Sequence, residues 1–165
     1  MRILFSLILL ALSLASPVHA ADKPAAAARA ADVAAIEKIV GQFKAAVIAH
    51  DGATITKLFL PDHESWLSVA DEAKWAKVKA LNPQARKVFP SSVKKFAEFI
   101  QTATAPVEER FYNVRIETNG AVASVWFNFD FLVDAKVTNR GSESWQMVRS
   151  EEGWKISSML YSVGD

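Results

Sequence analysis

Few residues in this sequence have side chains suited to proton transfer. Outside the first twenty residues the sequence contains His50 and His63, and its two tyrosines are Tyr112 and Tyr161. His50 falls at the end of a predicted helix, where a His stabilises the helix dipole. The run Asp62-His63-Glu64 falls in a predicted loop, and adjacent side chains rarely converge on one substrate atom. The sequence therefore assigns no catalytic residue.

Motifs for metal and cofactor chemistry are missing from the sequence. It contains no Cys, which excludes disulfides, thiol catalysis and zinc–thiolate sites. It also contains no His-Glu-x-x-His pair, phosphate-binding loop, dinucleotide fingerprint or nucleophile elbow. We therefore expect no bound metal and no cofactor.

Aromatic residues are the stronger signal of a binding site. The chain has five Trp and ten Phe, and small-molecule pockets are lined mainly by such side chains with a few polar groups. Any single aromatic residue is more often part of a core than of a site. The candidate ligand-binding residues are Trp66, Trp75, Phe111, Trp126, Trp145 and Tyr161, with Asn128, Asp130, Glu143 and Arg149 as polar contacts.

Residues 71–95 carry seven Lys and Arg against two acids, a local net charge of +5. One interpretation is a solvated face of a long connection. The other is a rim that attracts anions, in which Trp66 and Trp75 would line the mouth of a pocket. The second interpretation favours a ligand with an apolar body and an anionic end.

The first twenty residues indicate export. A positive Met1-Arg2 start precedes an apolar run from Ile3 to Ala15, and Val18-His19-Ala20 supplies small residues for cleavage after Ala20. The run is too short to favour the alternative of a membrane anchor. We therefore expect a signal peptide at residues 1–20, a flexible tether at 21–31 and one domain at 32–165. The mature protein would be periplasmic or secreted, without a membrane span.

Nucleic acid is not expected as a partner. Removal of Arg2 with the signal leaves 18 basic and 18 acidic residues, so the mature chain is formally neutral. Affinity for nucleic acid depends largely on positive charge.

The first half of the domain favours helices. Val33, Ile36, Val40, Phe43 and Val47 recur at helical spacing after Asp32, a predicted cap. A shorter helix follows Asp51-Gly52, and a third is expected from Ser91 or Ser92 to about Pro106.

Strands dominate from Glu108 onward. Asn119-Gly120 predicts a two-residue hairpin that pairs Ile116 with Ala123 and Val114 with Val125. This register turns Arg110, Tyr112 and Val114 toward the helices and Glu109 and Phe111 away from them.

A second hairpin is predicted around Ser150 to Gly153. It places Trp145 near Met159 and Glu143 near Tyr161, with Val148, Trp154, Ile156 and Leu160 on the opposite face. A bulge expected at Arg140-Gly141 leaves open which face Trp145 and Met147 occupy.

Three segments resemble the nuclear transport factor 2-like superfamily, which includes SnoaL-like and ketosteroid isomerase-like proteins. They are His50-Asp51-Gly52-Ala53 after a long helix, the long strand at 121–133, and the pattern Ser144-Trp145-Gln146-Met147-Val148 followed by Glu152-Gly153-Trp154-Lys155-Ile156. The resemblance implies an α+β, cone-shaped fold with N-terminal helices packed on a curved antiparallel sheet. It also implies a pocket at the open end of the cone and a homodimer through the outer sheet face.

Three functions are compatible with these observations. The first is an exported pocket protein that binds a small apolar or amphipathic molecule without converting it. The second is an isomerase, dehydratase or hydrolase acting on a small apolar substrate in the same pocket. The third is a protein-interaction module that uses the sheet face. A buried carboxylate facing the interior of the cone would favour the enzyme.

Overall fold

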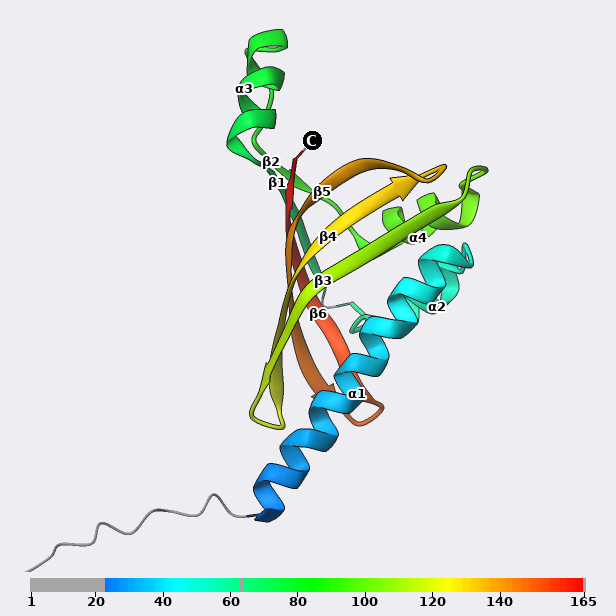
Figure 1. Ribbon diagram of the computed structural model, residues 1–165, viewed down its shortest axis with the longest axis vertical. Coiled ribbons are helices and arrows are strands. Elements are labelled where there is room, and N and C mark those ends of the chain that lie inside the picture. The colour runs from blue at the N-terminus through cyan, green and yellow to red at the C-terminus, as the bar shows by residue number, and fades with distance from the viewer. Residues whose placement is uncertain (1–22, 63, 165) are drawn as a thin grey trace, which may run out of the picture.

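The computed structural model describes residues 23–62 and 64–164, so the predicted signal peptide and His63 lie outside the described residues. The described chain contains four helices and six strands (Figure 1). In chain order they are α1 (Lys23–Ile48), α2 (Gly52–Leu58), β1 (Ser65–Ala70), α3 (Glu72–Leu81), β2 (Val88–Pro90), α4 (Val93–Thr102), β3 (Val107–Thr118), β4 (Val122–Val133), β5 (Lys136–Ser150) and β6 (Gly153–Val163).

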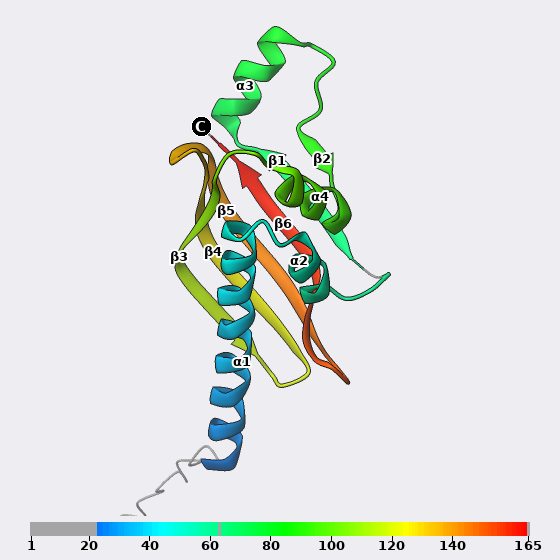
Figure 2. The ribbon, with the colours of Figure 1, turned by 90° about the vertical axis from the view of Figure 1, so that its right-hand side faces the viewer.

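The strands form a single curved sheet in the order β2-β1-β6-β5-β4-β3. β1 runs parallel to β6 and every other pair is antiparallel, so the sheet is mixed and not wholly antiparallel as expected. Helices α1, α2 and α4 lie on one face of the sheet, which curves around them (Figure 2). The expected α+β architecture of helices packed on a curved sheet is confirmed.

The first helix is longer than predicted. It begins at Lys23, inside the segment expected to be a tether, and Asp32 therefore lies within the helix and not at its cap. Asp51 does cap α2 by accepting a hydrogen bond from the Thr54 backbone N–H at 2.9 Å. Ser92 caps α4 in the same way, as the sequence predicts.

The β3–β4 hairpin has a different register from the predicted one. Ile116 pairs with Val125 and Thr118 with Ala123, because the Asn119 side chain organises a loop two residues longer. The four inner residues of β4, which are Ala123, Val125, Phe127 and Phe129, are nevertheless buried as expected.

A bulge in β3 exchanges the faces of its first half. The register shifts between Tyr112 and Arg115, and Asn113 within the shift has a left-handed φ of 54°. The prediction for this half of the strand is therefore wrong. Glu109 is buried on the helix side with Phe111 close to the core, while Arg110, Tyr112 and Val114 are exposed.

The β5–β6 hairpin confirms two predicted pairs, Trp145 with Met159 and Glu143 with Tyr161. The β4–β5 register skips Thr138, so the bulge lies there and not at Arg140-Gly141. The β5–β6 register also skips Ser157. This second skip brings Trp154 and Ile156 to the same buried face as Trp145, which corrects the expectation that they share a face with Leu160.

Aromatic side chains form the centre of the core. The Trp145 ring lies 5.1 Å from the rings of both Phe43 and Phe127, and all three residues are at most 1% exposed. The α3–β2 segment differs, because α3 has no buried residue and projects past the edge of the sheet (Figure 1). The core therefore joins α1, α2 and α4 to β1 and β3–β6, and the α3–β2 segment lies outside it.

Candidate functional site

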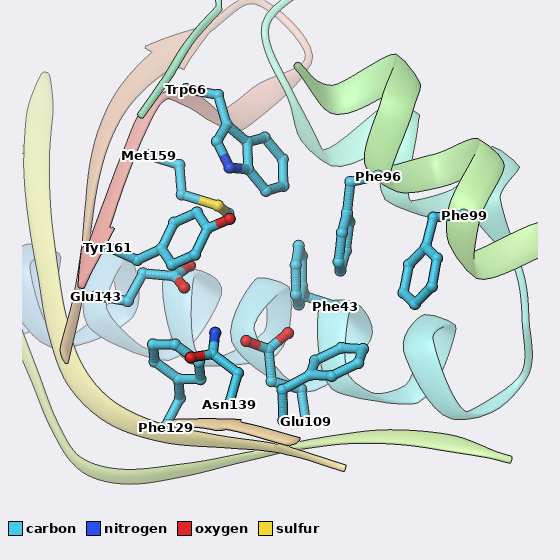
Figure 3. A pocket seen from close by; sticks show the side chains of 11 residues that line it. Phe43, Trp66, Phe96, Phe99, Glu109, Phe129, Asn139, Glu143, Met159 and Tyr161 are labelled. Atoms are coloured by element: carbon cyan, nitrogen blue, oxygen red, sulfur yellow. The ribbon is translucent and has the colours of Figure 1, made fainter. Parts of the chain in front are cut away.

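A cavity of about 240 Å³ opens between α1, α4 and the concave face of the sheet. Figure 3 shows its lining side chains converging from the helices and from β1 and β3–β6. The lining residues are Phe43, Trp66, Phe96, Phe99, Glu109, Phe129, Phe131, Asn139, Glu143, Met159 and Tyr161.

Aromatic rings make up most of the wall. Phe96 of α4 stacks on Phe43 of α1 with ring centroids 5.8 Å apart and planes 7° from parallel. On the sheet side, Trp66 meets Tyr161 edge-on at 6.4 Å. These contacts hold flat apolar surfaces in place, which suits a ligand with a planar apolar body.

Two glutamates are buried in this apolar wall. Glu109 of β3 is 5% exposed and Glu143 of β5 is 4% exposed. The bulge at Asn113 turns Glu109 inward, whereas Glu143 follows the regular alternation from Trp145. Both carboxyl groups point into the cavity (Figure 3), and no Lys, Arg or His of residues 23–62 and 64–164 lines it. A carboxylate in such a setting lacks the water or the cation that would stabilise its charge.

Burial raises the pKa of Glu143 to about 8, although the Trp145 indole N–H donates a hydrogen bond that lowers it. Burial raises the pKa of Glu109 well above its usual range, and the charge of Glu143 raises it further. Both groups are therefore protonated at pH 7. When the pair loses its first proton near pH 8, the charge settles on Glu143, where the Trp145 N–H stabilises it.

The third ionisable group in the cavity is Tyr161. Burial raises the pKa of its hydroxyl, and the neighbouring Ser68 and Trp66 lower it in part. The hydroxyl therefore remains a hydrogen-bond donor across the range in which the glutamates titrate. The cavity thus offers one carboxyl that can become a base and two acids that keep their protons.

Comparison with solved structures identifies the fold. An NTF2-like protein of unknown function from Shewanella baltica superposes with a TM-score of 0.57 at 14% identity, over 82% of this chain and 96% of that one. A proposed scytalone dehydratase from Novosphingobium aromaticivorans gives a TM-score of 0.64 at 14% identity, over 85% and 89%. The chain has the nuclear transport factor 2-like fold. No family model and no curated protein matches the sequence.

An NTF2-like protein from Silicibacter pomeroyi, also of unknown function, adds a TM-score of 0.56 at 15% identity, over 82% of this chain and 98% of that one. Sequence identities this low support a shared nuclear transport factor 2-like architecture, but they do not assign a role to any residue. The chemistry of the site must therefore be argued from the side chains in the cavity.

Three of the predicted site residues line the cavity: Trp66, Glu143 and Tyr161. Two more, Trp145 and Phe111, lie next to the cavity but outside its lining. Trp145 donates its indole N–H to Glu143, and Phe111 stacks on Phe127 with ring centroids 4.0 Å apart. The predicted site residues thus include the β1 side of the pocket and part of its β5 and β6 sides.

The other five predicted site residues lie elsewhere. Trp75 is on the projecting α3, and Trp126, Asn128 and Asp130 lie on the outer face of β4. On that face Asn128 bonds to Asn113 and Ser142, and Asp130 accepts a hydrogen bond from the Tyr112 hydroxyl. Arg149 pairs with Asp32 at 2.5 Å, away from the cavity lining.

Glu109 and Asn139 are the polar lining residues that the sequence analysis missed. Glu109 faces the cavity because of the bulge at Asn113, and Asn139 because of the bulge at Thr138. Each bulge reverses which side chains of the strand face the helices on one side of it. Asn113 carried a usable signal, because Asn adopts left-handed backbone more readily than other non-Gly residues. Phe96 and Phe99 of α4 were not among the predicted site residues, but they form part of the wall of the cavity.

The positive charges of residues 71–95, all of which the structure describes, do not line the cavity. The anionic ligand end inferred from those charges therefore has no counter-charge there. Within residues 23–62 and 64–164, no cluster of three metal-ligating side chains occurs. No helix of the described chain is long and apolar enough to cross a membrane.

Proposed function

We propose that this protein is an acid–base enzyme that moves a proton within a small, mainly apolar substrate, in an isomerisation or a dehydration. The supporting observation is the pair of buried glutamates in an aromatic cavity that contains no cation. Burying two acids without counter-ions destabilises the fold, and groups with shifted pKa values gather at active sites. A protein that only bound apolar molecules would have no need of them.

The two carboxyl groups take different roles. Glu143 has the lower pKa and, once ionised, accepts a proton from a carbon next to a substrate carbonyl or from a carbon next to the leaving group. Glu109 keeps its proton and donates it to the carbonyl oxygen or to the departing hydroxyl. In an isomerisation, Glu143 then returns its proton to another carbon and the enol oxygen returns its proton to Glu109. In a dehydration, H and OH leave the substrate as water, and the proton passes from Glu143 back to Glu109. No redox partner is required.

Turnover of cyclic enones and hydroxy ketones of one or two rings tests the proposal. Glu143→Gln and Glu109→Gln should each lower kcat by about 10²–10⁴-fold, the usual contribution of a general acid or base. Glu117→Gln, which changes an exposed glutamate of the same strand as Glu109, is the matched control and should have no effect. The wild-type rate should rise with pH through about 8 as Glu143 ionises.

A different result would favour the alternative of a binding protein. If the compounds bind with the same affinity to wild type and both Gln variants and none is converted, the glutamates perform no chemistry. The proposed enzyme would then be wrong, and the cavity would be a ligand-binding site.

We propose that the enzyme works outside the cytoplasm. Residues 1–20 have the composition of a cleavable signal, so the mature chain would start at Ala21. N-terminal sequencing of the protein from its native host provides the test. A soluble cytoplasmic protein that retains Met1 would contradict it.

We propose further that two copies associate through the outer face of the sheet. Tyr112 exposes 42% and Leu160 49% of its surface there, on either side of the half-buried Trp126. Apolar and aromatic groups on a polar face are typical of interface centres. Sedimentation at micromolar concentration should show a dimer that Leu160→Glu dissociates, whereas a monomeric wild type would contradict the proposal.

A further inference from the structure

Two buried side-chain polar atoms of the described residues have no hydrogen-bond partner, and both belong to residues that line the cavity. They are the indole Nε1 of Trp66 on β1 and the amide Oδ1 of Asn139 on β5. A buried polar atom without a partner destabilises the fold, and folded proteins contain few of them. Their occurrence in one cavity, on separate strands, indicates that something placed in the cavity completes their bonding.

The protein itself does not satisfy the Trp66 N–H. The Tyr161 hydroxyl is close enough for the indole to lower its pKa, but the two do not reach hydrogen-bonding geometry. Trp66 is 5% exposed and stacks on Phe59 with ring centroids 5.6 Å apart, so the indole is held in position. A fixed, buried N–H next to a phenol O–H is a site for an oxygen that accepts hydrogen bonds (Figure 3).

Asn139 presents the opposite requirement. Its unpaired carbonyl oxygen accepts hydrogen bonds, so the ligand group beside it must carry a donor. A hydroxyl meets this need without introducing a charge. The absence of Lys, Arg and His from the lining disfavours an anion, because a buried carboxylate on the ligand would have no counter-ion.

We propose that the ligand of this cavity is a neutral one- or two-ring molecule with a carbonyl oxygen bound at Trp66 and a hydroxyl bound at Asn139. This inference rests on the proposed function and names its substrate class. The size follows from the cavity, which at about 240 Å³ exceeds the roughly 150 Å³ that holds benzene. Trp66 and Asn139 are then positioning residues that set the direction in which the substrate lies relative to the two glutamates.

Four probes separate the contributions of the two polar groups. Naphthalene has neither group, 2-acetylnaphthalene has the carbonyl, 2-naphthol has the hydroxyl and 6-acetyl-2-naphthol has both. Binding to the mature protein is measured by calorimetry at pH 6.5, where both glutamates are protonated. Each group should tighten binding by about tenfold, the effect of one additional net hydrogen bond.

The variants assign each gain to its residue. Trp66→Phe keeps an aromatic ring and removes the N–H, so it should abolish the gain from the acetyl group and leave naphthalene affinity within about twofold. Asn139→Leu should abolish the gain from the hydroxyl alone. Trp75→Phe, on the projecting α3, is the matched control and should change neither gain.

Other outcomes would overturn the inference. Equal affinities for all four probes would contradict it, as would a Trp66→Phe variant that weakens every probe alike, because the indole would then act only by packing. In both cases a loss of turnover in Glu143→Gln would still support the proposed enzyme. If no probe binds and no compound is converted, the inference and the proposed function are both wrong.

Discussion

Carboxyl groups are buried at two places in the part of the chain that the structure describes, and in each place a Trp indole N–H faces an acid. Where α1 passes the β5–β6 turn, Asp32 is 6% exposed and accepts hydrogen bonds from Arg149 at 2.5 Å and Trp154 Nε1 at 3.4 Å. In the cavity, Glu143 accepts the indole N–H of Trp145, and no cation joins it.

The difference between the two places is the counter-ion. Asp32 is paired with Arg149, so it connects the first helix to the last hairpin. Glu143 and Glu109 have no cation and respond by holding their protons. A buried acid with a counter-ion contributes to the fold, whereas a buried acid without one destabilises the fold and is available for proton transfer.

The largest expected effect is the pH dependence of stability. Glu143 titrates near 4.5 in the unfolded chain and at about 8 in the fold, so only the unfolded state gives up its proton between these values. The contribution of Glu143 to the free energy of unfolding is therefore fully present below pH 4.5 and falls as pH rises to about 8, by about 1.4 kcal/mol per pH unit. The raised pKa of Glu109 adds a contribution of the same sign.

Urea unfolding at pH 5 and pH 8 measures this slope. The double variant Glu109→Gln/Glu143→Gln should lose most of it and be more stable than wild type at pH 8. The Glu117→Gln control should keep the wild-type slope. A double variant with an unchanged slope would show that both glutamates are ionised in the folded protein.

Replacing Asp32 is expected to change the stability in the opposite direction from replacing the two glutamates. Asp32→Asn removes the charge that Arg149 and Trp154 bind, and it should destabilise the protein by about 1–3 kcal/mol at pH 7. Thermal unfolding of Asp32→Asn and of Glu143→Gln, measured under the same conditions, compares the two stability changes. If both substitutions stabilise the protein, the ion pair contributes nothing to the fold.

The smallest expected effect concerns the two indoles. Trp145→Phe removes the hydrogen bond that lowers the pKa of Glu143, so this pKa should rise by about one unit. Carboxyl infrared bands followed between pH 6 and 10 report the change. Trp154→Phe is the matched substitution beside Asp32 and should leave the Glu143 titration unchanged.

Local sequence signals predicted much of the fold. Helical spacing from Val33 to Val47, the capping residues Asp51 and Ser92, and the alternation of Ala123 to Phe129 were correct because they depend on neighbouring residues alone. The resemblance to the nuclear transport factor 2-like superfamily added the architecture. Glu143 and Tyr161 were paired correctly because no bulge separates them from the Trp145–Met159 pair.

The half of the site that contains Glu109 and Asn139 was decided by the tertiary structure. A bulge moves every following side chain to the other face, and its position depends on how β3, β4 and β5 curve around the helices. The pKa values were decided at the same level, because a carboxyl group keeps its proton only when distant parts of the chain remove both water and cations from around it. The sequence by itself determined which acids the protein has, and packing determined which of them lack a partner.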